Sequence, residues 1–312
     1  MKIVGSQRFQ GILAPVVTPF DRHLNPDSGR LISHCKWLRS QRVGLAVFGT
    51  NSEANSLSVE EKIRLLDALV EHGVDPEWLM PGSGTCALSD TVRLTRHAAD
   101  LGCRGVLMLP PFYYKNVTDE GLFRYYAEVI ERVADPGLQV YLYHIPPIAQ
   151  VPLSLALIDR LVNAFPEVLA GIKDSSGDWH NTRALLEAGW KDFRVFCGSE
   201  SFLLRTMENG GAGCISATAN VNGSALVNLW ENWRTDAAPG LQDALDETRG
   251  FFQDFPMIAA LKATVACYSG DPDWHRLRPP LTTLSPEEQT RLEEGLRQRD
   301  FRMAGLRDFY VQ

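Results

Sequence analysis

Eight short apolar runs recur along the first 220 residues of the chain, and more polar segments separate them. Each run is almost continuously apolar rather than alternating, which is typical of parallel strands that are buried on both faces. The runs are GILAPVVTPF (11–20), VGLAVFGT (43–50), WLMPGSGT (78–85), GVLMLPPF (105–112), QVYLYHIP (139–146), LAGIKDSS (169–176), FRVFCGSE (193–200) and GCISATAN (213–220). This pattern predicts eight parallel strands.

The segments between these runs have the periodicity of amphipathic helices. In SLSVEEKIRLLDALVEHG (56–73), Ser58 precedes Glu61 at the spacing of a capping box, and Gly73 is a suitable helix stop. LSDTVRLTRHAADLG (88–102) and LSLALIDRLVNAF (153–165) repeat the pattern. A strand followed by a helix, eight times over, predicts a (β/α)8 TIM barrel of the α/β class.

The barrel accounts for residues 9–235, and residues 236–312 form a further helical region. The helical segments there are GLQDALDETRGFFQDF (240–255), PMIAALKATVACYSG (256–270) and SPEEQTRLEEGLRQRDFR (285–302). A doubly wound sheet is the alternative fold. It would be favoured by a G-x-G-x-x-G segment after the first strand, and APVVTPFDRHLNP (14–26) contains none.

The composition fits a globular enzyme and argues against two classes of partner. Of the 312 residues, 45% are hydrophobic and 22% charged, which is ordinary for globular proteins. The formal net charge of −7, with no basic cluster, argues against nucleic-acid binding. No run approaches 18 consecutive apolar residues, and MKIVGSQRFQ (1–10) lacks a signal-peptide core, so we expect a cytoplasmic protein that does not enter membranes.

The cysteines and histidines do not have the spacing of a metal site or a disulfide framework. No C-x-x-C pair occurs among the six cysteines, and no H-E-x-x-H among the seven histidines. We therefore expect reduced structural thiols and a reaction that needs neither a metal nor a cofactor.

Candidate chemistry lies where the predicted strands end, because a barrel places its reactive groups there. In LAGIKDSSGD (169–178), Lys173 is either the first solvated residue after a strand or a nucleophile at the mouth of the barrel. A free lysine has a pKa of about 10.4 and is a poor nucleophile at neutral pH, whereas burial lowers that pKa and produces Schiff-base lysines. Tyr143 ends the preceding run and is a candidate proton shuttle.

Three further groups belong to the same hypothesis. Thr50 is a candidate hydroxyl relay, and the backbone N–H groups from Gly49 to Asn51 are candidates for holding a substrate carboxylate. Taken singly, each feature also has a structural interpretation: Tyr143 as a core aromatic, and GTNSE (49–53) as an ordinary loop. His144 points to the opposite face from Tyr143 by strand alternation, and we interpret it as structural.

Four segments, in chain order, resemble motifs of the dihydrodipicolinate synthase and N-acetylneuraminate lyase superfamily. They are GTNSE (49–53), YHIP (143–146), GIKDSSG (171–177) and GGAGCISATAN (210–220). The resemblance covers nearly the whole chain, including the helical tail. It implies a TIM barrel with C-terminal helices, in which Lys173 forms an imine with pyruvate or a related 2-oxo acid.

The resemblance also implies roles for other residues. Tyr143 would be the acid and base, Thr50 the relay hydroxyl, and Gly49 to Asn51 the carboxylate-binding turn. Ile215 would turn its backbone carbonyl toward the substrate. Tyr113, or Tyr114 if a one-residue gap intervenes, would cross a dimer interface within a homotetramer built as a dimer of dimers.

One departure from the family pattern bears on the substrate. Dihydrodipicolinate synthases carry a carboxylate-binding arginine two residues after the Y-N-V-P segment, and here that position is Ile148, which cannot make a bidentate charged contact. Hydroxyl and carboxylate groups that suit a polyhydroxylated substrate stand near the expected second site: Ser175, Ser199, Glu200 and Thr218.

We therefore predict a lysine Schiff-base lyase or aldolase that cleaves or condenses a 4-hydroxy-2-oxo acid or a 2-keto-3-deoxy sugar acid, with a 2-oxo acid and an aldehyde as its small-molecule partners. Three alternatives stay open. They are dihydrodipicolinate synthase proper, a dehydratase or deaminase that uses the same imine, and a non-catalytic 2-oxo-acid-binding protein.

Overall fold

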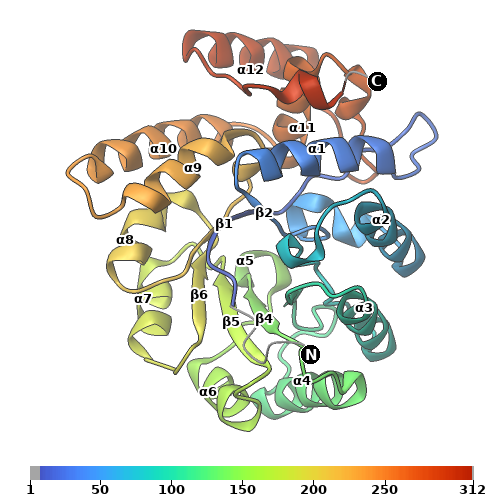
Figure 1. Ribbon diagram of the computed structural model, residues 1–312, viewed down its shortest axis with the longest axis vertical. Helices are drawn as coiled ribbons and strands as arrows, with labels where there is room; N and C mark the ends of the chain where they lie inside the picture. The colour runs from blue at the N-terminus through green and yellow to red at the C-terminus, as the bar shows by residue number, and fades with distance from the viewer. Residues whose placement is uncertain (1–7, 311–312) are drawn as a thin grey trace. The chain divides into compact units, whose positions relative to one another are not determined.

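The computed structural model describes residues 8–310, which form two compact units (Figure 1). Among the described residues, unit 1 comprises residues 8–11 and 75–215, and unit 2 comprises residues 12–74 and 216–310. Strands alternate with helices along the described chain, as predicted for the α/β class.

Unit 1 contains a parallel sheet of five strands in the order β7-β6-β5-β4-β3. The strands are β3 (Val106–Met108), β4 (Val140–His144), β5 (Leu169–Asp174), β6 (Arg194–Cys197) and β7 (Gly213–Ile215). Every residue of β4 and β5 is buried, which explains why their sequences are continuously apolar up to the last positions. Five of the eight predicted strands are thus confirmed in this unit.

The run at residues 78–85 is not a regular strand, and this part of the prediction is wrong. The segment makes a single parallel bridge to β3, between Gly82 and Leu107, where Leu107 N donates to Pro81 O over 3.0 Å and Ser83 N donates to Leu107 O over 3.1 Å. Pro81 has no N–H to extend the ladder. A Cβ atom at Gly84 would lie 2.3 Å from Leu109 N, so this segment packs directly against the backbone that follows β3.

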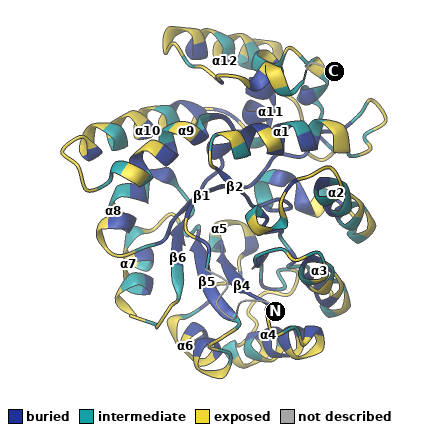
Figure 2. Ribbon diagram, viewed as in Figure 1, coloured by how far each residue is buried: buried dark blue, intermediate teal, exposed yellow. Residues whose placement is uncertain are grey.

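The helices of unit 1 follow its strands and present their polar faces to solvent. Figure 2 shows β4 and β5 buried and β6 partly so, while the neighbouring helices carry exposed residues on their outer sides. The helices are α3 (Leu88–Asp100), α4 (Asp119–Val133), α5 (Pro146–Ala149), α6 (Leu155–Ala164), α7 (Trp179–Glu187) and α8 (Leu203–Glu208), with the short 3-10 turns η3 (Pro76–Trp78) and η4 (Glu200–Phe202).

Unit 2 combines one parallel strand pair with six helices in the described residues. The strands are β1 (Gly11–Ala14), which begins in unit 1, and β2 (Gly44–Leu45). The helices are α1 (Ser28–Ser40), α2 (Val59–Glu71), α9 (Ala219–Asn232), α10 (Ala238–Gln253), α11 (Met257–Ser269) and α12 (Pro286–Gln298), with η1 (Thr50–Ser52), η2 (Ala54–Ser56), η5 (Pro272–His275) and η6 (Leu306–Phe309). The three C-terminal segments predicted to be helical are α10, α11 and α12.

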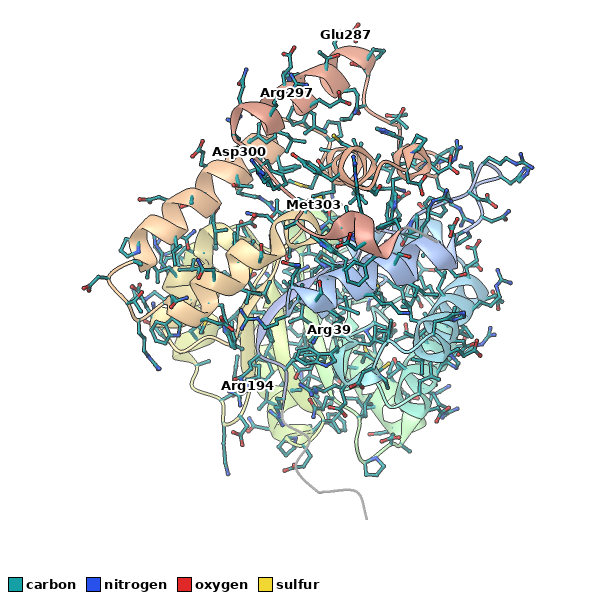
Figure 3. The ribbon with its side chains drawn as sticks, turned by 45° about the horizontal axis from the view of Figure 1, so that its top comes forward. Arg39, Arg194, Glu287, Arg297, Asp300 and Met303 are labelled. Atoms are coloured by element: carbon teal, nitrogen blue, oxygen red, sulfur yellow. The ribbon has the colours of Figure 1, made fainter. Side chains whose placement is uncertain are left out.

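The predicted capping box is present at α2, and the charges of α12 suit its two ends. At α2, Glu61 N donates to Ser58 Oγ over 3.2 Å and Ser58 N donates to the Glu61 carboxylate over 2.9 Å, which is a complete capping box. Figure 3 shows α12 with Glu287 at its start and Arg297 near its end, where each charge complements the helix dipole. None of the described helices is long and apolar enough to cross a membrane.

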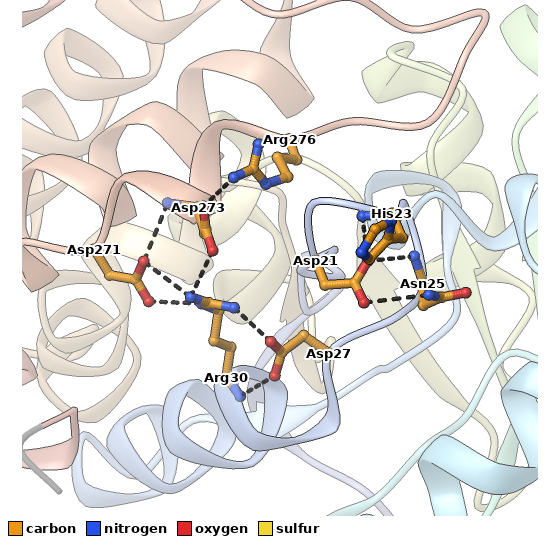
Figure 4. Close-up of polar contacts among 8 residues, drawn as sticks. All are labelled: Asp21, His23, Asn25, Asp27, Arg30, Asp271, Asp273 and Arg276. Atoms are coloured by element: carbon orange, nitrogen blue, oxygen red, sulfur yellow. Dashed lines mark hydrogen bonds and ion pairs between the residues drawn. The ribbon is translucent and has the colours of Figure 1, made fainter.

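A charged cluster joins the start of α1 to η5 within unit 2 (Figure 4). The Arg30 guanidinium contacts Asp27 over 2.5 Å, Asp271 over 2.6 Å and Asp273 over 2.9 Å. Asp273 also pairs with Arg276. Guanidinium groups occupy the space between these carboxylates, so the cluster stabilises the contact between α1 and η5. Across the described residues, no group of three or more His, Cys, Asp or Glu side chains is arranged to hold a metal ion.

Candidate active site

Lys173 and Tyr143 meet at the carboxyl ends of two neighbouring strands of unit 1. The register of the sheet pairs Tyr143 on β4 with Lys173 on β5. The Lys173 Nζ donates to the Tyr143 hydroxyl over 3.2 Å and lies 4.3 Å from the centre of its ring. Each residue is 2% exposed. The amine is therefore not a solvated strand end, and it has a hydroxyl group as its neighbour.

Tyr141, two residues before Tyr143 on the same strand, has a separate environment. Its hydroxyl accepts a hydrogen bond from Phe9 N over 2.8 Å and donates to Gln139 Oε1 over 3.2 Å. A Cβ atom at Gly171 would lie 2.9 Å from the Tyr141 ring, so this glycine makes room for the aromatic side chain. The hydroxyl groups of the two buried tyrosines of β4 thus bond to different partners, and only that of Tyr143 bonds to Lys173.

The residues that follow Tyr143 and Lys173 anchor the strand ends. His144 and Asp174 are paired in the sheet register, and both are buried. The His144 Nδ1 accepts a hydrogen bond from Leu153 N over 3.1 Å, and Thr182 Oγ1 donates to Asp174 Oδ2 over 2.6 Å. Burial lowers the pKa of His144, while the Asp174 carboxylate opposes this change. These contacts support the interpretation of His144 as structural.

Glu200 is a buried carboxylate in the neighbourhood of the lysine. It begins η4, directly after β6, and is 1% exposed. Burial raises the pKa of the Cys214 thiol well above its usual value, Cys197 and Glu200 raise it further, and the Lys173 amine opposes them. Because both Lys173 and Glu200 influence the Cys214 thiol, these two residues lie in one region of unit 1. Sequence reasoning did not single out the two cysteines, although the register pairs Cys197 with Cys214.

The remaining predicted residues of unit 1 also lie at strand ends. Ser175 follows β5, Ser199 precedes η4, and Ile215 is the last residue of β7. Ser175 N donates to His144 O over 2.7 Å, and Ser199 Oγ accepts a hydrogen bond from Ser201 N over 3.4 Å. Ser175 and Ser199 are half-buried, and Ile215 is fully buried.

An exposed apolar surface follows β3 and β4. Tyr113 and Tyr114 are each 74% exposed and pack edge to face with ring centres 5.3 Å apart. Ile148 on α5 is 62% exposed. The Lys115 ammonium ties the two segments together because it donates to Ala149 O over 2.7 Å and also to Phe112 O.

The predicted residues of unit 2 form a turn of their own. Thr50, Asn51 and Ser52 make the 3-10 turn η1 after Gly49. Gly49 N donates to Ser52 Oγ over 3.1 Å, so Ser52 already satisfies one of the three N–H groups expected to hold a carboxylate. Thr218 lies at the start of α9 and is fully buried.

The model of the dihydrodipicolinate synthetase family matches residues 8–299. The chain belongs to this family.

Its relatives have more than one named activity. A 4-hydroxy-tetrahydrodipicolinate synthase of Thermus thermophilus is 34% identical over 297 residues, which cover 91% of this chain and 94% of that protein. A putative 2-dehydro-3-deoxy-D-gluconate aldolase of Escherichia coli, YagE, is 29% identical over 304 residues, which cover 94% and 98%. The crystal structure of YagE in complex with pyruvate has a TM-score of 0.85 at 27% identity and covers 94% of this chain and 99% of that chain. Membership of the family therefore indicates lyase chemistry without choosing a substrate.

Proposed function

We propose that the protein is a class I lyase in which Lys173 forms a Schiff base with pyruvate or a related 2-oxo acid. The observation that carries this proposal is a buried amine with a tyrosine hydroxyl 3.2 Å away. The pyruvate complex of YagE supports the choice of a 2-oxo acid. We also propose that the strands close into a (β/α)8 barrel at residues 9–235, with residues 236–312 as a helical region.

The reaction begins with attack of the neutral Lys173 amine on the C2 carbonyl of the 2-oxo acid. The resulting carbinolamine loses water to give an iminium ion, and the leaving hydroxyl group needs a proton that Tyr143 is placed to donate. The iminium accepts the electron pair of the C3–C4 bond when the C4 hydroxyl loses its proton, so an aldehyde leaves and an enamine remains. Protonation of the enamine at C3 and hydrolysis release pyruvate and regenerate the lysine.

We propose that the turn in unit 2 serves the same reaction. Thr50 relays protons to Tyr143, and the N–H groups of Thr50 and Asn51 bind the carboxylate of the 2-oxo acid. The Gly49 N–H contributes less, because Ser52 Oγ already accepts it. The Ile215 backbone carbonyl faces the bound 2-oxo acid.

We propose a 4-hydroxy-2-oxo acid or a 2-keto-3-deoxy sugar acid as the substrate for cleavage. Ile148 presents an exposed aliphatic side chain that cannot bind a carboxylate, whereas Ser175, Ser199, Glu200 and Thr218 supply hydroxyl and carboxylate groups. The named activity of YagE agrees with this class. Dihydrodipicolinate synthase proper is the second candidate, favoured by the 34% identity to the Thermus thermophilus enzyme.

We propose that the surface formed by Tyr113, Tyr114 and Ile148 is covered in a homo-oligomer, with Tyr113 crossing the interface of a dimer and two dimers forming a tetramer. Two tyrosines at 74% exposure on one loop leave a large aromatic area for a partner to cover. Light scattering on the purified protein measures this directly, and a monomeric mass would refute it.

Borohydride trapping tests the imine. Wild type, Lys173→Ala and Lys115→Ala are reduced in the presence of pyruvate, and the intact masses are measured. Lys115 is the matched control, because it lies in the segment that follows β3 of the same sheet and its ammonium is bonded to two backbone carbonyls. We expect a pyruvate-sized adduct on wild type and on Lys115→Ala, and none on Lys173→Ala. An adduct that persists without Lys173, or no adduct with any of a panel of longer 2-oxo acids, would refute the proposal.

Product analysis separates the alternatives that share the imine. With the substrate identified from the panel, release of pyruvate and an aldehyde indicates cleavage. Release of water or ammonia with an unbroken carbon chain indicates a dehydratase or deaminase. Stable adduct formation with no turnover of any substrate indicates a 2-oxo-acid-binding protein.

A further inference from the structure

A second lysine of the chain is fully buried, and it lies in unit 2. Lys262 is on α11, and its side chain and that of Glu53 are both 0% exposed. The Lys262 Nζ donates to Glu53 Oε1 over 2.8 Å and to Thr18 O over 2.8 Å. It also lies 4.6 Å from the centre of the Phe20 ring. This ammonium is thus committed to partners inside the protein.

Glu53 is the residue that ends the turn containing Thr50. Its backbone is left-handed, with φ 55° and ψ 34°, and it joins η1 to η2. Residues other than glycine seldom adopt this conformation unless surrounding contacts hold them there. Here the carboxylate is held at both oxygens, because Lys262 donates to Oε1 and Arg278 N donates to Oε2 over 3.1 Å.

The same ammonium reaches the turn by a second route. Lys262 binds Thr18 O, and the hydroxyl of Thr18 donates to Ser52 O over 2.6 Å. Ser52 Oγ in turn accepts a hydrogen bond from Gly49 N over 3.1 Å. A single side chain of α11 therefore constrains both the last residue of the turn, through Glu53, and its body, through Thr18 and Ser52.

We propose that Lys262 is a positioning residue for the Gly49–Glu53 turn, and that its ion pair with Glu53 sets where Thr50 and Asn51 present their hydroxyl and N–H groups to the 2-oxo acid. This inference rests on the proposed function, because it assigns the turn to carboxylate binding. Lys262 itself touches no substrate.

The test compares four forms of the full-length protein: wild type, Lys262→Met, Lys262→Met/Glu53→Gln and Leu245→Ala. Methionine keeps the length of the lysine stem without its charge, and the double variant leaves no charge buried without a partner. Leu245 is a buried residue of α10, so its truncation lowers stability without touching the turn. Tm, and kcat and KM for the 2-oxo acid or its precursor, are measured for each form.

We expect both Lys262 variants to raise KM at least tenfold, and we expect the double variant to have a higher Tm than Lys262→Met without recovering KM. Leu245→Ala lowers Tm and keeps the KM of wild type. If Lys262→Met does not fold, the KM of the double variant alone tests the inference. A wild-type KM in a folded Lys262 variant, or a raised KM in Leu245→Ala that follows its loss of Tm, would overturn the inference. Absence of any borohydride adduct on wild type would instead overturn the proposed function.

Discussion

Replacement of Tyr143 by phenylalanine is the perturbation that isolates the proposed proton shuttle. The ring is buried, so phenylalanine keeps its packing, and the change removes the hydroxyl that lies 3.2 Å from Lys173. Acid and base assistance by a positioned side chain is worth roughly 10²- to 10⁴-fold in rate, which corresponds to about 2.7–5.5 kcal/mol of transition-state stabilisation. We therefore expect kcat to fall by roughly that factor while KM changes little. The reason is that the Tyr143 hydroxyl assists proton transfer in the transition state and contributes little to substrate binding in the ground state.

The stability of this variant should change far less than its rate. A hydrogen bond lost from the folded state costs about 0.5–1.5 kcal/mol net, which lowers the Tm of a chain this size by a few degrees at most. A steady-state assay and a thermal melt on the same preparation measure the two effects together.

Tyr141→Phe is the matched control for this experiment. It removes a second buried hydroxyl from the same strand, and it leaves Phe9 N without its acceptor. An unsatisfied buried group costs about 1–3 kcal/mol, so this variant should lose stability and keep its kcat. A Tyr143→Phe enzyme with kcat within threefold of wild type would remove Tyr143 from the mechanism. Equal losses of kcat in both variants would show that the effect is structural.

Two further predictions concern stability and strand geometry. Burial lowers the pKa of His34 to about 3, so between pH 6.5 and 5 only the unfolded state takes up its proton. The free energy of unfolding therefore decreases as the pH falls, by about 2 kcal/mol over that range. Denaturant titrations at both pH values should show this decrease in wild type and lack it in His34→Gln. An equal decrease in the two proteins would contradict the prediction. At Gly171, a Cβ atom would lie 2.2 Å from Arg194 O, so Gly171→Ala must move β5 away from β6. We expect it to cost about 1–3 kcal/mol and to reduce kcat by displacing Lys173, whereas wild-type kcat and Tm would show that β5 accommodates the methyl group.

The strands were predictable because burial on both faces leaves a continuous apolar run in the sequence. That signal reports hydrophobicity and not backbone geometry, which is why it failed at residues 78–85. Pro81 cannot donate to a ladder, and Gly84 lies against the Leu109 backbone. Both residues are visible in the sequence, but their effect depends on the distance to the neighbouring strand.

Much of the candidate site was predictable for a related reason. Parallel strands bring their carboxyl ends to one edge, so Tyr143 and Lys173 were expected near each other and lie in register. The ion pair of Glu53 and Lys262 was not predicted, because a local sequence pattern does not indicate which distant residue will pair with a buried charge. A lysine within the apolar helix PMIAALKATVACYSG (256–270) indicates only that the ammonium needs such a partner.

A comparison of Lys173 with Lys262 also shows why burial alone does not identify a Schiff-base residue. Burial lowers the pKa of Lys262 to about 8, even though Glu53 favours its charged form, so by acidity alone this amine would be a suitable nucleophile. Its position argues otherwise, because its hydrogen bonds go to a carboxylate and a backbone carbonyl, and its side chain is 0% exposed. The Lys173 Nζ instead bonds to the Tyr143 hydroxyl, at the carboxyl ends of two strands, where a barrel places its reactive groups. The partners and position of each amine, rather than its burial, therefore distinguish the proposed nucleophile from the lysine that is held by an ion pair. Peptide mapping of the borohydride adduct should find Lys173 modified and Lys262 intact.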